Sequence, residues 1–437
     1  MKLPKDDLLI RAFRKLLRIL RAGQALMVMF LSHGTRIAYH FYRERKAFQR
    51  NRWADVRLHL VARLNLLGAR RGSRLNRIFE ISGCRDVNDL TYELITEHRS
   101  YLTDLFQKFP AGDILDCYQY FRYFGDFRIA NFLRIQALNA SLRQQMTLPH
   151  VVPQGLNAAL ELGKPEVALE LLKKKKIRKR DLQHVEEIKA MAHALLGEHS
   201  AANQLWCERF QDSDYLFREL INDRSIAVVG PAPPSDEVGS EIDSYDLIVR
   251  TNYRIGSNNP VNLYGSRTDI SYYSHYRMAT HRDEVVSAAS ALRWTILKSQ
   301  SDEKKLRGSF PEYAGETRSA FLPHLIFFND AAPMAIQTIL NDLIRFSPRC
   351  IKLFCTNFYN SDKTYNKDYR PVPLQSGVIS ESLRIHEPFS GFVFVQNLKR
   401  AGLFTTDRHT AEVLGLSREE YAENINAIYG EFTLPVL

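Results

Sequence analysis

The chain has 437 residues, of which 45% are hydrophobic and 11% aromatic, and it carries a formal net charge of +11. This length exceeds one compact core and predicts two or three domains, while the hydrophobic content excludes a generally disordered chain. The five cysteines are scattered and form no CxxC pair, which argues against a disulfide framework or a zinc site and favours a reducing compartment.

The positive charge is concentrated near the N-terminus, where residues 1–80 hold 19 Lys/Arg and 5 Asp/Glu. LLIRAFRKLLRILRAGQALMVMFL, which starts at Leu8, has apolar residues at helical spacing with arginines between them. We therefore predict a basic amphipathic helical segment over residues 1–48. Two interpretations stay open: contact with an anionic membrane surface, or packing on a neighbouring helix with solvated arginines. No aromatic-plus-basic module accompanies the charge, so no nucleic acid partner is expected.

A helical pattern continues over residues 49–222. Two consecutive runs resemble a helical-repeat hairpin, with turns at Gly163 and Gly197. These runs are LNAALELGKPEVALELLKKKK and DLQHVEEIKAMAHALLGEHSAANQLW. We predict an α-helical domain with repeat-like packing. The basic run KKKKIRKR, from Lys173 to Arg180, is interpreted as a solvated helix end and not as a polyanion contact. Small residues mark the expected close approaches between helices, namely Ala158, Ala168, Ala190 and Ala194.

The pattern changes at Ser225, where short apolar runs alternate with connections of helix length. This alternation predicts an α/β fold for residues 223–437, with a Rossmann-like parallel sheet flanked by helices. No run approaches the ~18–20 apolar residues that span a bilayer, and no secretory signal is recognisable, so we expect a cytoplasmic protein. The predicted strands are SIAVVG, DLIVRTN, TDISYYS, RWTILK and IKLFCTN.

The first two of these strands end in residues suited to a binding site. In an open α/β sheet, ligands bind at the carboxyl ends of the strands. IAVVG ends on Gly230, which lets a phosphate or ribose approach the main chain, and DLIVRTN delivers Arg250 and Asn252 beside it. GPAPP is neither GxGxxG nor a Walker loop, so the usual dinucleotide and ATP fingerprints are absent.

The order of motifs across residues 223–430 resembles that of sialyltransferases. VVG…ID..D.IVR.N…GSRTDI is similar to the first conserved motif of the eukaryotic and bacterial lipooligosaccharide types, and the stretch from Asp330 to Tyr359 has the layout of the second. The resemblance implies a CMP-sugar pocket. Two departures stand out: Pro231 follows the glycine where these families place Asn, and Ala331-Ala332-Pro333 replaces a Ser/Thr-rich start. The expected nucleotide-sugar-binding residues are Gly230, Asn252, Ser274, Thr356 and Asn357.

The same resemblance implies the catalytic residues. The bacterial enzymes have a pair of tyrosines after this strand that serve the departing phosphate, which corresponds here to Tyr359 and Tyr365, whereas Tyr369 is expected to be a packing residue. A late histidine acts as general base in those families, and His386 has the corresponding place. Glu387 either orients it or caps the following helix.

We therefore expect an inverting glycosyltransferase that moves a 2-keto sugar acid, sialic acid or Kdo, from CMP to a glycan of a surface polysaccharide such as capsule or lipopolysaccharide. Lipid-linked acceptors and a peripheral contact of residues 1–48 with the inner membrane remain options. No Asp-x-Asp stands at a strand end, so neither metal nor another cofactor is expected. The expectation requires Gly230, Asn252, Tyr359 and His386 to line one cavity.

Two other classes stay open. The first is a non-catalytic helical-repeat interaction protein with a degenerate transferase-like domain, because of Pro231 and the Ala331–Pro333 turn. The second is a different nucleotide-binding α/β enzyme. Of these three classes, only the predicted transferase is expected to bind CMP, and the others would not be stabilised by it. A ligand at 100 times its dissociation constant raises the free energy of unfolding by about 2.7 kcal/mol, so a melting curve distinguishes them.

Overall fold

A computed structural model describes the chain from residue 92 to 430 with gaps. The described ranges are 92–107, 109–123, 125–256, 259–309, 316–323, 326–328, 333–361, 365, 366, 369, 383 and 386–430. The predictions for residues 1–48, for the first part of the helical domain (residues 49–91), and for Asp330, Ala331 and Ala332 lie outside these ranges. Residues 106–432 form one compact unit, and residues 1–105 with 433–437 form another, whose described helices are α6 (Tyr92–Glu97) and most of α7 (Arg99–Phe106).

Helices occupy residues 111–221, as the sequence predicts. Gly163 and Gly197 follow the C-termini of two of them with φ of 69° and 77°, a left-handed conformation that glycine adopts without strain. The four alanines predicted at close helix approaches are all fully buried. The elements are α8 (Ala111–Tyr123), α9 (Phe127–Thr147), α10 (Pro153–Glu161), α11 (Pro165–Lys174), η2 (Lys179–Asp181), α12 (Leu182–Leu195), α13 (His199–Cys207) and α14 (Asp212–Ile221).

The α/β part is built on one parallel sheet of seven strands in the order β5-β4-β3-β2-β1-β6-β7. Each of the five apolar runs predicted as strands forms one, namely β1, β2, β3, β4 and β6. The strands are β1 (Ser225–Val229), β2 (Leu247–Thr251), β3 (Ile270–Tyr273), β4 (Trp294–Leu297), β5 (Glu316–Ser319), β6 (Cys350–Phe354) and β7 (Thr405–Thr406).

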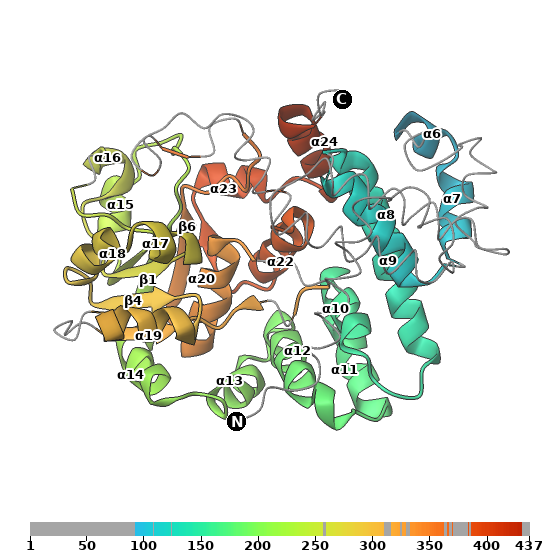
Figure 1. Ribbon diagram of the computed structural model, residues 1–437, viewed down its shortest axis with the longest axis horizontal. Helices are drawn as coiled ribbons and strands as arrows, with labels where there is room; N and C mark the ends of the chain where they lie inside the picture. The colour runs from blue at the N-terminus through green and yellow to red at the C-terminus, as the bar shows by residue number, and fades with distance from the viewer. Residues whose placement is uncertain are drawn as a thin grey trace, which may run out of the picture. The chain divides into compact units, whose positions relative to one another are not determined.

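Helices lie on both faces of this sheet (Figure 1), as expected for strands such as β3 and β4 that are buried along their whole length. The structure therefore confirms the Rossmann-like α/β fold predicted for this part of the chain. The connecting helices are α15 (Gly239–Asp243), α16 (Val261–Tyr264), α17 (His275–Thr280), α18 (Arg282–Ala289), α19 (Gln300–Ser309), α20 (Ala335–Leu343), η4 (Ile344–Phe346), α22 (Pro388–Arg400), α23 (Arg408–Val413) and α24 (Arg418–Tyr429).

The strand order reverses at β1. From β1 the chain moves outward through β2 to β5, and it then returns to place β6 on the other side of β1. Such a switch point leaves a crevice at the carboxyl ends of the strands on either side of it, where ligands bind in open α/β sheets. The topology therefore directs attention to the residues that follow β1, β2 and β6.

The helices of residues 111–221 and the α/β part of the chain share buried ion pairs. The predicted boundary near residue 222 falls between α14 and β1, where helix gives way to strand. Three arginines with no more than 2% exposure reach across it to carboxylates. These pairs are Arg318 with Asp214, Arg345 with Glu187, and Arg134 with Glu387.

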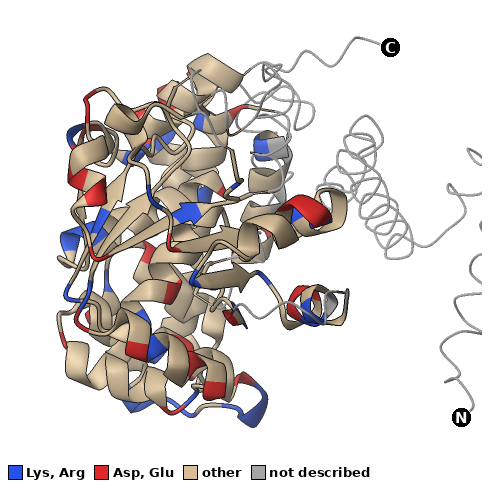
Figure 2. Ribbon diagram, turned by 90° about the vertical axis from the view of Figure 1, so that its left-hand side faces the viewer, with Lys and Arg blue, Asp and Glu red and all other residues tan. Residues whose placement is uncertain are grey.

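Surface charge in the described part is mixed. Lys/Arg and Asp/Glu positions are interspersed on the face that Figure 2 presents. The cation-rich residues 1–80 lie outside the described ranges. Among the helices that the structure describes, none is both long and apolar enough to cross a bilayer.

Candidate functional site

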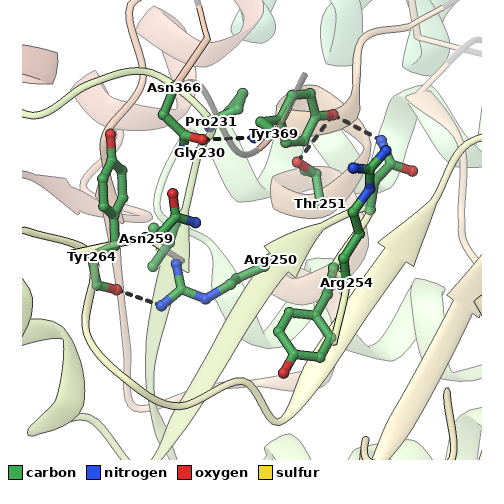
Figure 3. A pocket seen from close by; sticks show the side chains of 12 residues that line it. Gly230, Pro231, Arg250, Thr251, Arg254, Asn259, Tyr264, Asn366 and Tyr369 are labelled. Atoms are coloured by element: carbon green, nitrogen blue, oxygen red, sulfur yellow. Dashed lines mark hydrogen bonds between the residues drawn. The ribbon is translucent and has the colours of Figure 1, made fainter. Parts of the chain in front are cut away.

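Two adjoining cavities open at the carboxyl ends of β1, β2 and β6. The first, of about 430 Å³, is lined by the ends of β1 and β2 (Figure 3). The second, of about 480 Å³, lies between the turn after β6 and the start of α20. Pro231, Thr251 and Tyr369 line both cavities. Ligands of open α/β sheets bind in the crevice at the carboxyl ends of the strands, so this pair of cavities is the candidate site.

Gly230, directly after β1, lies tightly against the end of β6 and the turn that follows it. Its amide donates to the Phe354 carbonyl at 2.9 Å. A Cβ at this position would lie 2.5 Å from the Cys355 carbonyl oxygen and closer still to Thr356 Oγ1. The glycine is therefore required by strand packing at the cavity, in addition to the ligand approach that the sequence predicts.

We expect Gly230→Ala to lower the free energy of unfolding by about 1–3 kcal/mol, because the new methyl group overlaps backbone that cannot move aside easily. Urea denaturation followed by circular dichroism measures this change. Gly308→Ala is the matched control, since it lies within α19 with nothing within 4 Å of the added Cβ. Equal stability of Gly230→Ala and the parent would contradict the packing role.

Asn252 is held at the end of β2 by both ends of its side-chain amide. Its Oδ1 accepts from the Ser274 amide at 3.0 Å, and its Nδ2 donates to the Tyr369 hydroxyl at 2.8 Å. Its φ of 49° is left-handed, which Asn tolerates better than most residues. Tyr369, which the sequence placed among packing residues, thus joins the two cavities through its hydroxyl. Ser274 itself is the N-cap of α17 and lines neither cavity.

Arg250 brings a half-buried cation into the first cavity. Its guanidinium donates to Thr268 Oγ1 at 3.0 Å and to the carbonyls of Tyr264 and Arg267, and Figure 3 shows it extending toward Tyr264. No carboxylate forms an ion pair with it among the described residues. Burial lowers the pKa of the Arg250 guanidinium. A positive charge that is bonded to carbonyls and a hydroxyl, without an ion pair to a described carboxylate, suits a cavity that receives an anion.

The second cavity contains a cluster of phenols. The hydroxyls of Tyr359 and Tyr365 lie 3.0 Å apart, and the Tyr365 ring stacks on that of Tyr369 at 5.1 Å. Thr356 and Asn357, both buried, also line this cavity. Asn357 Oδ1 accepts from the Tyr359 amide at 3.2 Å and so fixes the turn that carries the phenol. The structure therefore brings together the predicted tyrosine pair and two of the predicted binding residues.

The start of α20 forms the opposite wall of the second cavity. The first-turn amides of a helix have no partner within the helix and attract anions. Gln337, in this first turn, is 1% exposed, and its Oε1 has no hydrogen-bond partner among the described residues. Nearby, Lys298 Nζ donates to the Pro333 carbonyl at 3.3 Å, and burial lowers the pKa of its ammonium group to about 8.

His386 lies just before α22 and lines neither of the two cavities. Its carbonyl accepts from Arg122 Nη1 at 2.9 Å, which ties it to α8. Glu387 caps α22 by accepting from the Phe389 amide, and its buried carboxylate also pairs with Arg134. Of the four residues expected in one cavity, two line the first, Tyr359 lines the second, and His386 lies outside both.

A second histidine stands at the same edge of the sheet and was missed by the sequence reasoning. His275 begins α17, directly after Ser274, and its Nδ1 is hydrogen-bonded to the buried carboxylate of Asp302 in α19. Its side chain is 59% exposed. The motif order gave no signal for this residue, because its partner is 27 residues away in the chain.

No protein-family model matches this chain, and a search of curated proteins finds no match. Within the described ranges, no three His, Cys, Asp or Glu side chains gather in a group able to hold a metal ion. Metal independence therefore stays a prediction from the sequence.

Proposed function

We propose that the chain is an inverting glycosyltransferase that transfers a 2-keto sugar acid, sialic acid or Kdo, from CMP to an acceptor glycan. The observation that carries this proposal is the pair of adjoining cavities at the switch point. One is lined by Gly230, Arg250 and Asn252, and the other by the phenols of Tyr359 and Tyr365. A nucleotide in the first cavity would place its phosphate near Tyr369 and its sugar in the second.

An acidic sugar fits the second cavity better than a neutral one. The start of α20 and the Lys298 ammonium, which donates to the Pro333 carbonyl just before that helix, supply partial or full positive charge to this region. A carboxylate on the anomeric carbon would be stabilised there. The Ser/Thr-rich start that the resemblance implies is replaced, and backbone amides would take over its role.

The proposed reaction is a direct displacement at the anomeric carbon through an oxocarbenium-like transition state. The phenols of Tyr359 and Tyr365 donate to the phosphate as the bond to CMP breaks. His386 removes the proton of the acceptor hydroxyl, for which an unperturbed imidazole pKa of ~6.5 is suitable. Because His386 lies outside both described cavities, the acceptor would approach from the side of α22.

The helices before the sheet are proposed to be a repeat-like support. α10 and α11 are joined by a short turn at Gly163, and α12 and α13 by a short turn at Gly197. We further propose a cytoplasmic enzyme whose basic segment, residues 1–48, contacts an anionic membrane where lipid-linked acceptors reside.

The test is to incubate the purified chain with CMP-Neu5Ac and CMP-Kdo separately, with candidate glycans, and to measure CMP release. We expect release with one donor, unaffected by EDTA, and a higher melting temperature when CMP is added. Activity abolished by EDTA would contradict metal independence alone. If the chain releases no CMP and is not stabilised by CMP, the proposed function is overturned and the non-catalytic class is favoured.

A further inference from the structure

The turn that follows β6 has an unusual backbone. Cys355, Phe358 and Tyr359 have φ of 54°, 50° and 65°, and none of them is glycine. Bulky L-residues rarely adopt this left-handed conformation, and they keep it only where the surrounding structure imposes it. The turn also carries the Tyr359 phenol into the second cavity. Whatever imposes the backbone conformation therefore also sets the position of this phenol.

The C-terminal helices supply the contacts that hold this turn. At its start, the Cys355 amide donates to Asp407 Oδ2 at 2.8 Å, just before α23. At its centre, the hydroxyl of Tyr421, from α24, donates to the Phe358 carbonyl at 2.9 Å. Beyond it, the Tyr429 hydroxyl donates to the Ser361 carbonyl at 2.7 Å.

Tyr421 is the most constrained of these partners. It is fully buried, and its ring lies parallel to that of Phe392 in α22, with 3.9 Å between centroids and 4° between planes. Phe392 in turn meets the Phe358 ring edge-on at 6.1 Å. The hydroxyl therefore has little freedom to turn away from the Phe358 carbonyl. Burial raises the pKa of Tyr421 well above its usual value, so the group stays a neutral donor.

We propose that Tyr421 is a positioning residue, whose hydroxyl holds the Phe358 carbonyl and thereby keeps the Tyr359 phenol facing the departing phosphate. Without this hydrogen bond, the carbonyl of Phe358 is left buried beside an apolar ring, and the left-handed pair relaxes toward ordinary backbone angles. The phenol then leaves its place beside Tyr365. This inference rests on the proposed function, because it assigns Tyr421 to the support of a group that acts on CMP departure.

The experiment is a double-variant cycle in the full chain, with CMP release as the readout. Tyr421→Phe keeps the ring and removes only the hydroxyl. We expect its kcat to fall about tenfold, with the donor KM changed less than twofold, because the loss is one of orientation and not of donor binding. In a Tyr359→Phe background, the same change should lower kcat less than twofold further, since the hydroxyl that it positions is already gone.

Tyr429→Phe is the matched control, because it removes a hydroxyl from the same helix that is bonded two residues beyond Tyr359. We expect less than a twofold change in kcat. Two results would overturn the inference and give Tyr421 a general structural role. The first is a tenfold loss of kcat from Tyr421→Phe both in the parent chain and in Tyr359→Phe, and the second is an equal loss of kcat in Tyr429→Phe. The proposed function would stand in either case. A parent chain that releases no CMP would overturn both.

Discussion

Replacement of His386 by alanine is expected to lower kcat about 10²–10⁴-fold, the usual contribution of a positioned general base. The backbone at this residue is anchored independently of the side chain, because Arg122 of α8 donates to the His386 carbonyl and Glu387 caps α22. The variant should therefore keep the parent's fold. Initial rates of CMP release with saturating donor and acceptor measure the effect.

His275→Ala is the informative control for this experiment. The His275 imidazole is exposed and hydrogen-bonded to the buried Asp302 carboxylate at the carboxyl edge of the sheet, an arrangement that is typical of a general base. We expect less than a threefold loss in this variant. A large loss in His275→Ala, together with parent-like rates in His386→Ala, would move the role of general base to α17.

Replacement of Arg134 by methionine is expected to destabilise the protein by about 3–5 kcal/mol, the range for removing one partner of a buried ion pair. Arg134 donates to both oxygens of Glu161 at 2.7 Å and lies 3.1 Å from the Glu387 carboxylate. Its own side chain is fully buried. The variant leaves two buried carboxylates with only Arg122 and Arg418 as cations.

Urea denaturation at neutral pH measures this loss. Lys174→Met is the control, because its pair with Glu170 is exposed and should contribute nothing measurable. A pH series adds a second readout. Burial opposes the charge of Glu161, yet Arg134 lowers its pKa from 4.5 to about 2, so its stabilisation is present above about pH 4.5 and lost as the pH falls toward 2. In Arg134→Met this acid-dependent loss should be smaller. Parent-like stability of the variant would show that the network is dispensable.

Most of the sheet could be predicted because its strands are apolar runs, but β5 could not. Its sequence is ETRS, and two of its four residues, Thr317 and Arg318, are fully buried. Arg318 is accommodated by Asp342 and by Asp214, which lie 24 and 104 residues away in the chain. Hydropathy assigns such a residue to the surface, because only the tertiary structure supplies the carboxylates that make its burial tolerable. β7, with only two residues, is too short to leave a pattern.

The sequence predicts those residues of the candidate site that directly follow a strand. Gly230 and Asn252 follow β1 and β2, and parallel strands place such residues at one edge. Tyr369 was assigned to packing, because nothing near it in the chain reveals the hydrogen bond to Asn252, which is 117 residues away. The role of Tyr421 was equally hidden, since its contact with Phe358 joins residues 63 positions apart. Sequence patterns locate a site at an edge, whereas long-range hydrogen bonds decide which side chains face it.

The buried carboxylate of Glu387 limits how this protein can be recombined. Tyr118 of α8 and Arg134 of α9 both bind it, and Arg122 reaches from its carboxylate to the backbone of the neighbouring histidine. Residues 223–437 therefore depend on α8 and α9 to neutralise a buried charge. An exchange of this half with that of another protein, by gene fusion or by design, would have to include α8 and α9, because the Glu387 carboxylate would otherwise be buried without Tyr118 and Arg134.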